Sequence, residues 1–318
     1  MDATAPHTAQ ATPAGTGAAF GAQAGSAVAV IGVGNMGGAM ALNLLARGWP
    51  VTVCDIDSSK TQYFSEKNAN VSAMPSYCAI ENRVFIICVV DAIQTQTVLF
   101  GPQGLASSAR AGDVVLLCPT LSPASVEQFA QQLAALGVHT IDAPMSGGPA
   151  RAADGSMSLM LACPEQVFEG QRQLVEALSS KVFRISTRVG DAARTKLVNN
   201  LLAGINLVAA AEALALAQRM GLNLATTLAV IEQSSGQSWI GSDRMQRALQ
   251  GDYAPRAHMT LLEKDTRLAI EAASSVGYTA PLGQAASAAF AQAAAAGLAG
   301  LDDSAMFQHM GGLPATRG

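Results

Sequence analysis

Charged side chains are scarce in this sequence: they make up 13% of its 318 residues. Lysines and arginines number 19 against 23 aspartates and glutamates, so the formal net charge is -4. A chain without a positive surplus lacks the field that attracts phosphate backbones. We therefore expect no nucleic-acid partner.

Histidine and cysteine are also few, and they are not spaced as ligands. The four histidines form no H-E-x-x-H pattern, and no two of the five cysteines form a C-x-x-C pair. Zinc centres and Ser-His-Asp triads need such residues in defined sets, so we expect no metal site and no triad. Several cysteines lie in apolar, strand-like segments, where buried thiols are common. This pattern favours a reducing, cytoplasmic setting.

A membrane span is not expected either. The longest apolar stretch, residues 197–217, contains three asparagines and a glutamate, which are costly in a bilayer. We expect this stretch to form a buried helix and expect no membrane association. Residues 1–25 have almost no large apolar side chain and no basic start, which predicts a disordered tail rather than a secretory signal.

Half of the residues are apolar, and a chain of this length is typical of about two domains. Residues 26–188 alternate short β-branched runs with amphipathic segments, a rhythm that predicts βαβ units. After residue 189 the period becomes 3.6, with glycines between segments. We expect a doubly wound, mostly parallel Rossmann-type sheet over residues 26–188 and an all-α substrate and oligomerisation domain over residues 189–318. The expected helices of the second domain cover residues 192–220, 223–233, 242–250, 261–275 and 281–296.

A glycine-rich loop directly follows the first expected strand and opens a helix. In that context its glycines permit a tight turn, close approach of a pyrophosphate and close packing of the helix on the strand. A glycine-rich turn without a ligand is the alternative. The six residues of the loop, all predicted to bind the cofactor, are Gly32, Val33, Gly34, Asn35, Met36 and Gly37.

An acidic residue ends the next expected strand. Asp55 lies 23 residues after Gly32, where a carboxylate accepts hydrogen bonds from the adenosine ribose and repels a 2′-phosphate. Residues 56–58 contain no arginine or lysine that would neutralise such a phosphate. The sequence predicts NAD in preference to NADP, with an ordinary strand-end acid as the alternative.

A second loop, DAPMSGG, follows the last expected parallel strand. Ser146 has a hydroxyl donor, and Gly147 and Gly148 have unhindered amides, a set that suits a carboxylate. We predict that these three residues bind the carboxylate of the substrate. A flexible turn is the alternative.

Lys196 and Asn200 are four residues apart near the start of the long helix, so they share one face. A lysine that loses water in such apolar surroundings has a lowered pKa, and its amine can take the proton of a substrate hydroxyl during hydride transfer. Asn200 would orient that hydroxyl. A solvated lysine at a helix start is the alternative, but the neighbouring asparagines and the apolar residues that follow favour burial.

These motifs occur together and in order. The segments GVGNMGGAMALNLL, DAPMSGG, GDAARTKLVNNLLAG and EKD resemble the β-hydroxyacid dehydrogenase family, over residues 27–307. The resemblance implies an NAD-dependent dehydrogenase that acts on CH-OH groups, with Lys196 as the catalytic lysine and Asn200 as its partner. It also implies that Thr120 lies beside the nicotinamide ribose, that Lys264 contacts the cofactor, and that the chain forms a homodimer or homotetramer.

Within the family, LLAGINLVAAAEALALAQRMGL and SSGQSW are most similar to members that oxidise the C2 hydroxyl of L-threonate, a four-carbon sugar acid, to 2-oxo-tetronate. A polyhydroxy substrate needs additional polar partners. The alternative for these residues is a helix connection in which Trp239 only packs. The candidate partners are Ser234, Gln237, Ser238 and Arg244.

Two other functions stay open at this stage. One is the oxidation of 3-hydroxyisobutyrate or another short β-hydroxyacid. The other is a non-catalytic NAD-binding sensor or scaffold, although such a protein has no chemical need for a buried lysine beside an asparagine.

Two residues depart from the usual family pattern. Arg151 stands where the family has a small residue, and Pro119 stands where a serine commonly precedes Thr120. Arg151 either adds a cation near the mouth of the site or points to solvent. Neither departure touches the proton chemistry expected of Lys196.

Overall fold

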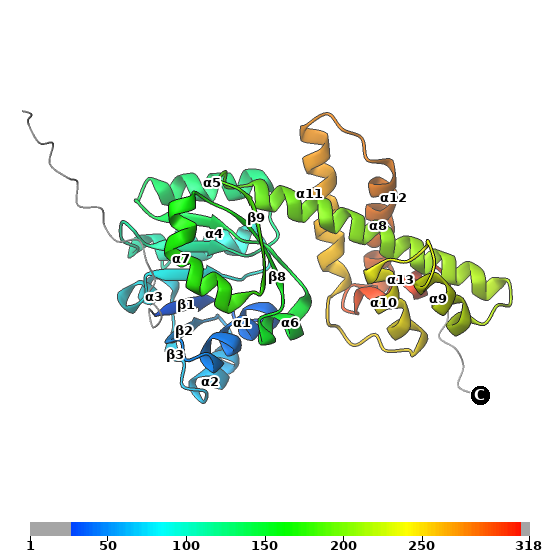
Figure 1. The fold of residues 1–318 in the computed structure, drawn as a ribbon, viewed down its shortest axis with the longest axis horizontal. Coiled ribbons are helices and arrows are strands. Elements are labelled where there is room, and N and C mark those ends of the chain that lie inside the picture. The colour runs from blue at the N-terminus through cyan, green and yellow to red at the C-terminus, as the bar shows by residue number, and fades with distance from the viewer. Residues whose placement is uncertain (1–26, 313–318) are drawn as a thin grey trace, which may run out of the picture.

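The structure is a computed structural model that describes residues 27–312. A sheet covered by helices and a helical region are joined by the long helix α8 (Asp191–Arg219), as Figure 1 shows. This architecture confirms the predicted fold class. The predicted tail, residues 1–25, lies outside the described residues.

Nine strands form a single sheet in the described part of the chain. Their order is β3-β2-β1-β4-β5-β6-β8-β7, with β9 paired to β8. Strands β1 to β6 are parallel, whereas β8 is antiparallel to β6 and β7. The strands are β1 (Val28–Ile31), β2 (Val51–Cys54), β3 (Asn70–Ser72), β4 (Val84–Ile87), β5 (Val114–Leu117), β6 (His139–Asp142), β7 (Met145–Ser146), β8 (Ser158–Ala162) and β9 (Lys181–Ser186).

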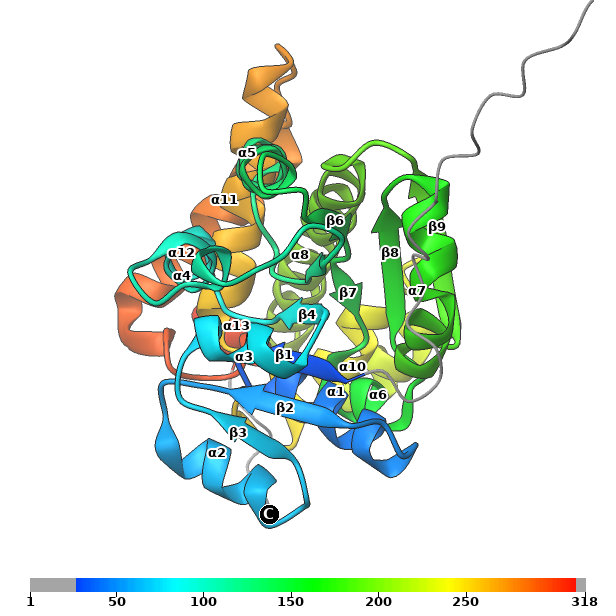
Figure 2. The same cartoon turned by 90° about the vertical axis from the view of Figure 1, so that its left-hand side faces the viewer.

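Both faces of the central strands β1, β4 and β5 are buried, which explains why these strands are continuous apolar runs. Val28 and Val30 of β1 pack into the core that contains α1 and α7, while Ala29 and Ile31 pack into the core beneath α4 and α5. Figure 2 shows helices on both sides of the sheet. Helices α2, α3 and α6 also belong to this sheet-bearing region. The helices of this region are α1 (Asn35–Ala46), α2 (Ser58–Ser65), α3 (Pro75–Glu81), α4 (Ala92–Phe100), α5 (Pro123–Ala134), α6 (Gly148–Asp154) and α7 (Glu165–Leu178).

The helical region is built around α8, which packs against α10, α11 and α12. Helix α10 begins three residues before the predicted start at residue 242, because the Ser238 hydroxyl caps it by accepting the Gly241 N–H. Helix α12 ends before residue 296 and continues as a π turn in which Gly297 has a φ of 90°. The remaining helices are α9 (Leu224–Glu232), α10 (Trp239–Leu249), α11 (Met259–Ser275), α12 (Pro281–Ala293) and α13 (Met306–His309).

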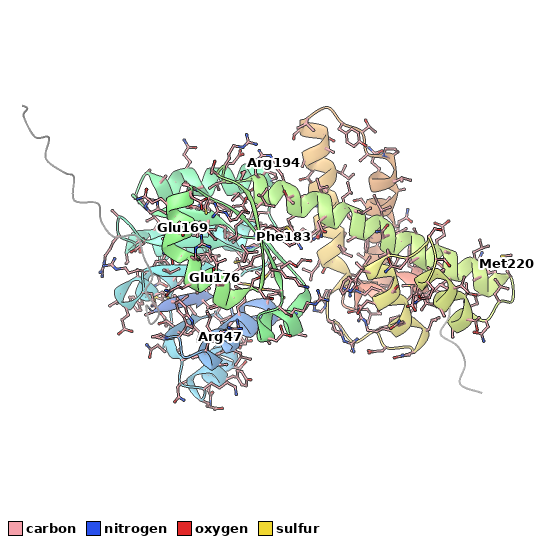
Figure 3. The ribbon with its side chains drawn as sticks, in the orientation of Figure 1. Arg47, Glu169, Glu176, Phe183, Arg194 and Met220 are labelled. Carbon is pink, nitrogen blue, oxygen red and sulfur yellow. The ribbon has the colours of Figure 1, made fainter. Side chains whose placement is uncertain are left out.

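Helix α8 is the one described helix that is long and apolar enough to cross a bilayer by length and composition alone. In the structure it runs from the edge of the sheet through the helical region, with Arg194 near its start and Met220 just past its end (Figure 3). Lys196 and Asn200 are buried on it. Helix α8 therefore links the two regions, but it is buried only in part, since Val198, Leu202 and Leu216 are exposed; the prediction of a buried helix is correct for its inner side chains alone.

Candidate active site

The glycine-rich loop connects β1 to α1. Gly32 has a φ of 90°, and a Cβ on it would lie 2.6 Å from the Cys88 carbonyl oxygen. A Cβ on Gly37 would collide with the Gly32 carbonyl oxygen. These two glycines are thus required by the fold of the loop itself.

Gly34 is different, because nothing in the described protein requires it to be glycine. Its φ of -70° is ordinary, it is exposed, and a Cβ on it would meet no atom within 4 Å. Gly34 caps α1 without a side chain, and no acidic residue stands in the first turn after it. The open space over this helix N-terminus fits a dinucleotide pyrophosphate, with Val33, Asn35 and Met36 beside it.

Asp55, just after β2, holds the loop from the side. Its Oδ2 accepts the Val33 N–H at 2.8 Å, and its Oδ1 accepts the Asp57 N–H at 3.0 Å. Carboxylate oxygens have further lone pairs, so these bonds leave acceptors for ribose hydroxyls. Lys60 also approaches, with its Nζ 3.8 Å from Asp55 Oδ1. Lys60 was missed from the sequence, because only the fold of α2 brings it back toward the end of the strand.

Lys196 is buried on α8 and is 6% exposed. Burial lowers the pKa of its ammonium, the nearby Asp265 carboxylate raises it in part, and the Lys264 ammonium lowers it further. The net shift is downward. A larger share of neutral amine is the state that a general base needs.

Asn200 and Asp265 are joined beside Lys196. The Asn200 Nδ2 donates to Asp265 Oδ2 at 2.6 Å, and the Asn199 Nδ2 donates to Asn200 Oδ1 at 2.9 Å. Asp265 lies on α11, is 6% exposed, and was missed from the sequence. The EKD segment was its signal, but the segment does not reveal that α11 packs on α8 and brings the two side chains together.

Lys264 ties the helical region to the sheet. Its Nζ donates to the Thr120 carbonyl at 2.7 Å and to the Val90 carbonyl at 3.2 Å, beyond the carboxyl ends of β5 and β4. It also lies 3.2 Å from Asp265 Oδ1, an ion pair without hydrogen-bond geometry. Ligands of open α/β sheets bind at this edge. Lys264 and Thr120 thus lie together where a cofactor is expected, although the ammonium is already engaged by protein acceptors.

The DAPMSGG loop contacts the start of α8 in addition to its expected role in binding the substrate. Asp142, at the end of β6, is fully buried, and its Oδ2 accepts the Gly190 and Ala193 N–H groups at 2.9 and 3.0 Å. Burial raises the pKa of Asp142 to about 6, and these hydrogen bonds oppose part of that rise. The carboxylate joins the sheet to the start of the lysine-bearing helix.

Ser146, Gly147 and Gly148 are half-buried at the same edge. Gly147 and Gly148 have φ values of 127° and 74°, and the two successive left-handed residues turn the backbone sharply into α6. Such turns arrange amides as anion donors. The binding of a substrate carboxylate by these three residues stays a prediction.

The four remaining candidates lie near the start of α10. Gln237 and Ser234 are exposed, whereas the Ser238 oxygen already caps α10. Arg244 is engaged by Asp303 at 2.6 Å and by Asp243. The structure therefore leaves Ser234 and Gln237 as the two exposed side chains of this set, and assigns Arg244 to an ion-pair network.

The comparisons with known proteins agree with this geometry. Residues 27–186 match the model of the NAD binding domain of 6-phosphogluconate dehydrogenase, and residues 190–310 match that of the NAD-binding domain of NADP-dependent 3-hydroxyisobutyrate dehydrogenase. An L-threonate dehydrogenase from Cupriavidus necator is 35% identical, over 90% of this chain and 96% of that protein. A 2-(hydroxymethyl)glutarate dehydrogenase from Eubacterium barkeri is 32% identical, over 88% of this chain and 93% of that protein.

A solved structure is similar over nearly the whole described chain. The 3-hydroxyisobutyrate dehydrogenase from Salmonella typhimurium has a TM-score of 0.83 and 33% sequence identity, over 89% of this chain and 99% of that one. Together with the glycine-rich loop and the buried lysine, these matches confirm an NAD-binding dehydrogenase that acts on CH-OH groups. The chain belongs to the β-hydroxyacid dehydrogenase family.

Proposed function

We propose that this chain oxidises the C2 hydroxyl of L-threonate to 2-oxo-tetronate with NAD, and that Lys196 takes up the hydroxyl proton. The observation that carries the proposal is the burial of Lys196 on α8 beside Asn200 and Asp265. A lysine desolvated in this way is a base at a pH where an exposed lysine is an acid.

Each residue of the site has a place in this proposal. The amide and hydroxyl groups of Ser146, Gly147 and Gly148 hold the substrate carboxylate. Asn200, oriented by Asp265, directs the reacting hydroxyl toward the Lys196 amine. NAD supplies the nicotinamide ring that accepts the hydride. The protein contributes alignment and removes water from the reacting groups.

Two observations favour L-threonate as the substrate: the similarity of this chain to a known L-threonate dehydrogenase, and the polar side chains at the start of α10. The L-threonate dehydrogenase of Cupriavidus necator is 35% identical to this chain. The polar groups at the start of α10, with Gln237 and Ser238 among them, suit the hydroxyls of a sugar acid. The second candidate is a short β-hydroxyacid, because the similar solved structure is named a 3-hydroxyisobutyrate dehydrogenase.

A substrate panel tests the proposal. The purified protein with NAD is assayed for NADH formation on L-threonate, D-threonate, the erythronates, glycerate and 3-hydroxyisobutyrate. We expect the highest kcat/KM with L-threonate. Robust turnover of 3-hydroxyisobutyrate alone would replace L-threonate by the second candidate, and a lack of turnover with every acid would refute both.

The remaining assignments follow from the same picture. We assign residues 26–188 to the NAD-binding domain and residues 189–318 to the substrate and oligomerisation domain. We also propose a cytoplasmic homodimer or homotetramer that uses NAD rather than NADP and acts without metal, membrane or nucleic acid.

A further inference from the structure

Arg151 and Trp239 come from the two different regions of the molecule and meet. Arg151 lies on α6, and its guanidinium carbon is 5.6 Å from the centre of the Trp239 ring, at the start of α10. The stem of Arg151 lies against the substrate loop, since a Cβ on Gly147 would be 2.9 Å from Arg151 Cδ. The guanidinium therefore lies just beyond the loop predicted to hold a carboxylate.

The two arginines around Trp239 differ in their partners. Arg244, whose guanidinium carbon is 6.0 Å from the ring centre, is engaged by Asp243 and by the buried Asp303. Arg151 is half-buried and forms no ion pair among the described residues, although the exposed Asp154 carboxylate on the same helix lies near enough to interact with its charge. Trp239 is 57% exposed, so its ring does not close off the space beside Arg151.

A guanidinium held over an aromatic ring keeps N–H groups that can bind other partners. Paired N–H donors match the two oxygens of a carboxylate, and the contact with the ring restricts the side chain, which lowers the entropy lost on binding. The first carboxylate of a hydroxyacid already has donors at Ser146, Gly147 and Gly148. A guanidinium placed beyond them is positioned for a second anionic group on the same molecule.

We propose that Arg151, held against Trp239, binds a second carboxylate, so that the site accepts hydroxydicarboxylates of about the length of a four-carbon acid. This inference rests on the proposed function, because it uses residues 146–148 as the first carboxylate site. It extends the substrate class from sugar acids with one carboxylate to acids that carry a carboxylate at each end.

Binding of unreactive acids tests the inference. The NAD-loaded protein is titrated calorimetrically with succinate and with butyrate, which have the same chain length and differ by one carboxylate. We expect succinate to bind about tenfold more tightly or better, as a charge-assisted bidentate contact provides. We expect Arg151→Gln to abolish this preference while butyrate affinity and NAD affinity stay unchanged. Neither acid has a hydroxyl, so the outcome is separate from any failure to oxidise L-threonate.

Two further variants complete the test. Arg172→Gln removes one charge from α7 on the sheet-bearing region, where its partners Glu169 and Glu176 are labelled in Figure 3, and it should keep the full preference. Arg151→Lys keeps the charge but loses the paired donors, so it should lower the preference at least about threefold. Equal binding of both acids by the unchanged protein would overturn the inference. A succinate preference that survives in Arg151→Gln would overturn it as well, and so would an undiminished preference in Arg151→Lys if the glutamine variant does not fold.

Discussion

At the scale of single residues, the proposed role of Lys196 as the base makes its protonation state decisive for the reaction. Oxidation needs the neutral amine, so activity should rise with pH through the lowered pKa of Lys196. We expect Lys196→Ala to lower kcat by about a thousandfold, as loss of a general base does. Lys196→Arg keeps a cation that cannot deprotonate, and it should be equally inactive. NAD titration of both variants should give the affinity of the unchanged protein, and an active alanine variant would exclude this role.

Asp265 tunes the same group from α11. Its carboxylate raises the pKa of Lys196 against the larger effect of burial, so Asp265→Asn should lower that pKa. The acid limb of the profile of kcat against pH should then move to lower pH, while the amide still accepts the Asn200 hydrogen bond. A purely structural role for Asp265 predicts a smaller kcat with the limb unmoved.

Asp55 is the residue that we expect to decide between the two dinucleotides. Asp55→Asn keeps an acceptor for the Val33 N–H but removes the charge that repels a 2′-phosphate, and it leaves Lys60 with Asp57 as its one remaining carboxylate partner among the described residues. We expect the ratio of kcat/KM for NADP to that for NAD to rise at least about tenfold. The double variant Asp55→Asn with Lys60→Ala should lose much of that gain, and an unchanged ratio in the single variant would refute the assignment.

At the scale of elements, Asp142 fastens α8 to the sheet. The folded carboxyl titrates at about 6 and the unfolded one near 3.8, so between these values the folded state holds the extra proton. The free energy of unfolding contributed by Asp142 therefore falls as pH rises from about 4 to about 6 and stays low above. Asp142→Asn keeps the acceptor without the buried charge and should be at least as stable as the unchanged protein at neutral pH.

Asp142→Ala loses the acceptor and leaves the Gly190 and Ala193 N–H groups unpaired. We expect it to lower the free energy of unfolding by about 1 to 2 kcal/mol, as the loss of a helix cap does. Urea unfolding of both variants measures the difference. Equal stability of the alanine and asparagine variants would show that the cap does not contribute.

At the scale of the whole molecule, α8 and α12 leave apolar side chains uncovered. Val198 and Leu202 lie four residues apart on α8 and are 70% and 58% exposed, and Leu282 on α12 is 69% exposed. Burial of such a surface drives subunit association. Light scattering should show that Val198→Glu with Leu202→Glu lowers the mass to that of a monomer. Ile93→Glu, on α4 of the sheet-bearing region, should leave the mass unchanged, and a mass unaffected by the double variant would place the interface elsewhere.

Much of the architecture could be predicted because it rests on local patterns. Buried parallel strands must be apolar on both faces, and α8 is a long run of mainly apolar residues. Both patterns can be recognised in the sequence, so the sheet, the helical region and the fold class can be predicted from it. The glycine-rich loop can be recognised for a similar reason. The positive φ of Gly32 and the close contacts of Gly32 and Gly37 leave room only for glycine at these two positions. Membership in the family follows from these ordered motifs.

Contacts between distant segments could not be predicted from the sequence, because no local periodicity specifies which side chains meet when α11 packs on α8. Three contacts of this kind join residues at least 48 positions apart. They are the hydrogen bond of Asn200 to Asp265, the cap that Asp142 forms on α8, and the contact of Arg151 with the Trp239 ring. The approach of Lys60 to Asp55 likewise depends on the tertiary structure, because the position of α2 determines it. Local residue chemistry thus selects the fold and the type of reaction. Packing of remote elements selects the partners that tune Lys196 and shape the site, since burial and charge act through space rather than along the chain.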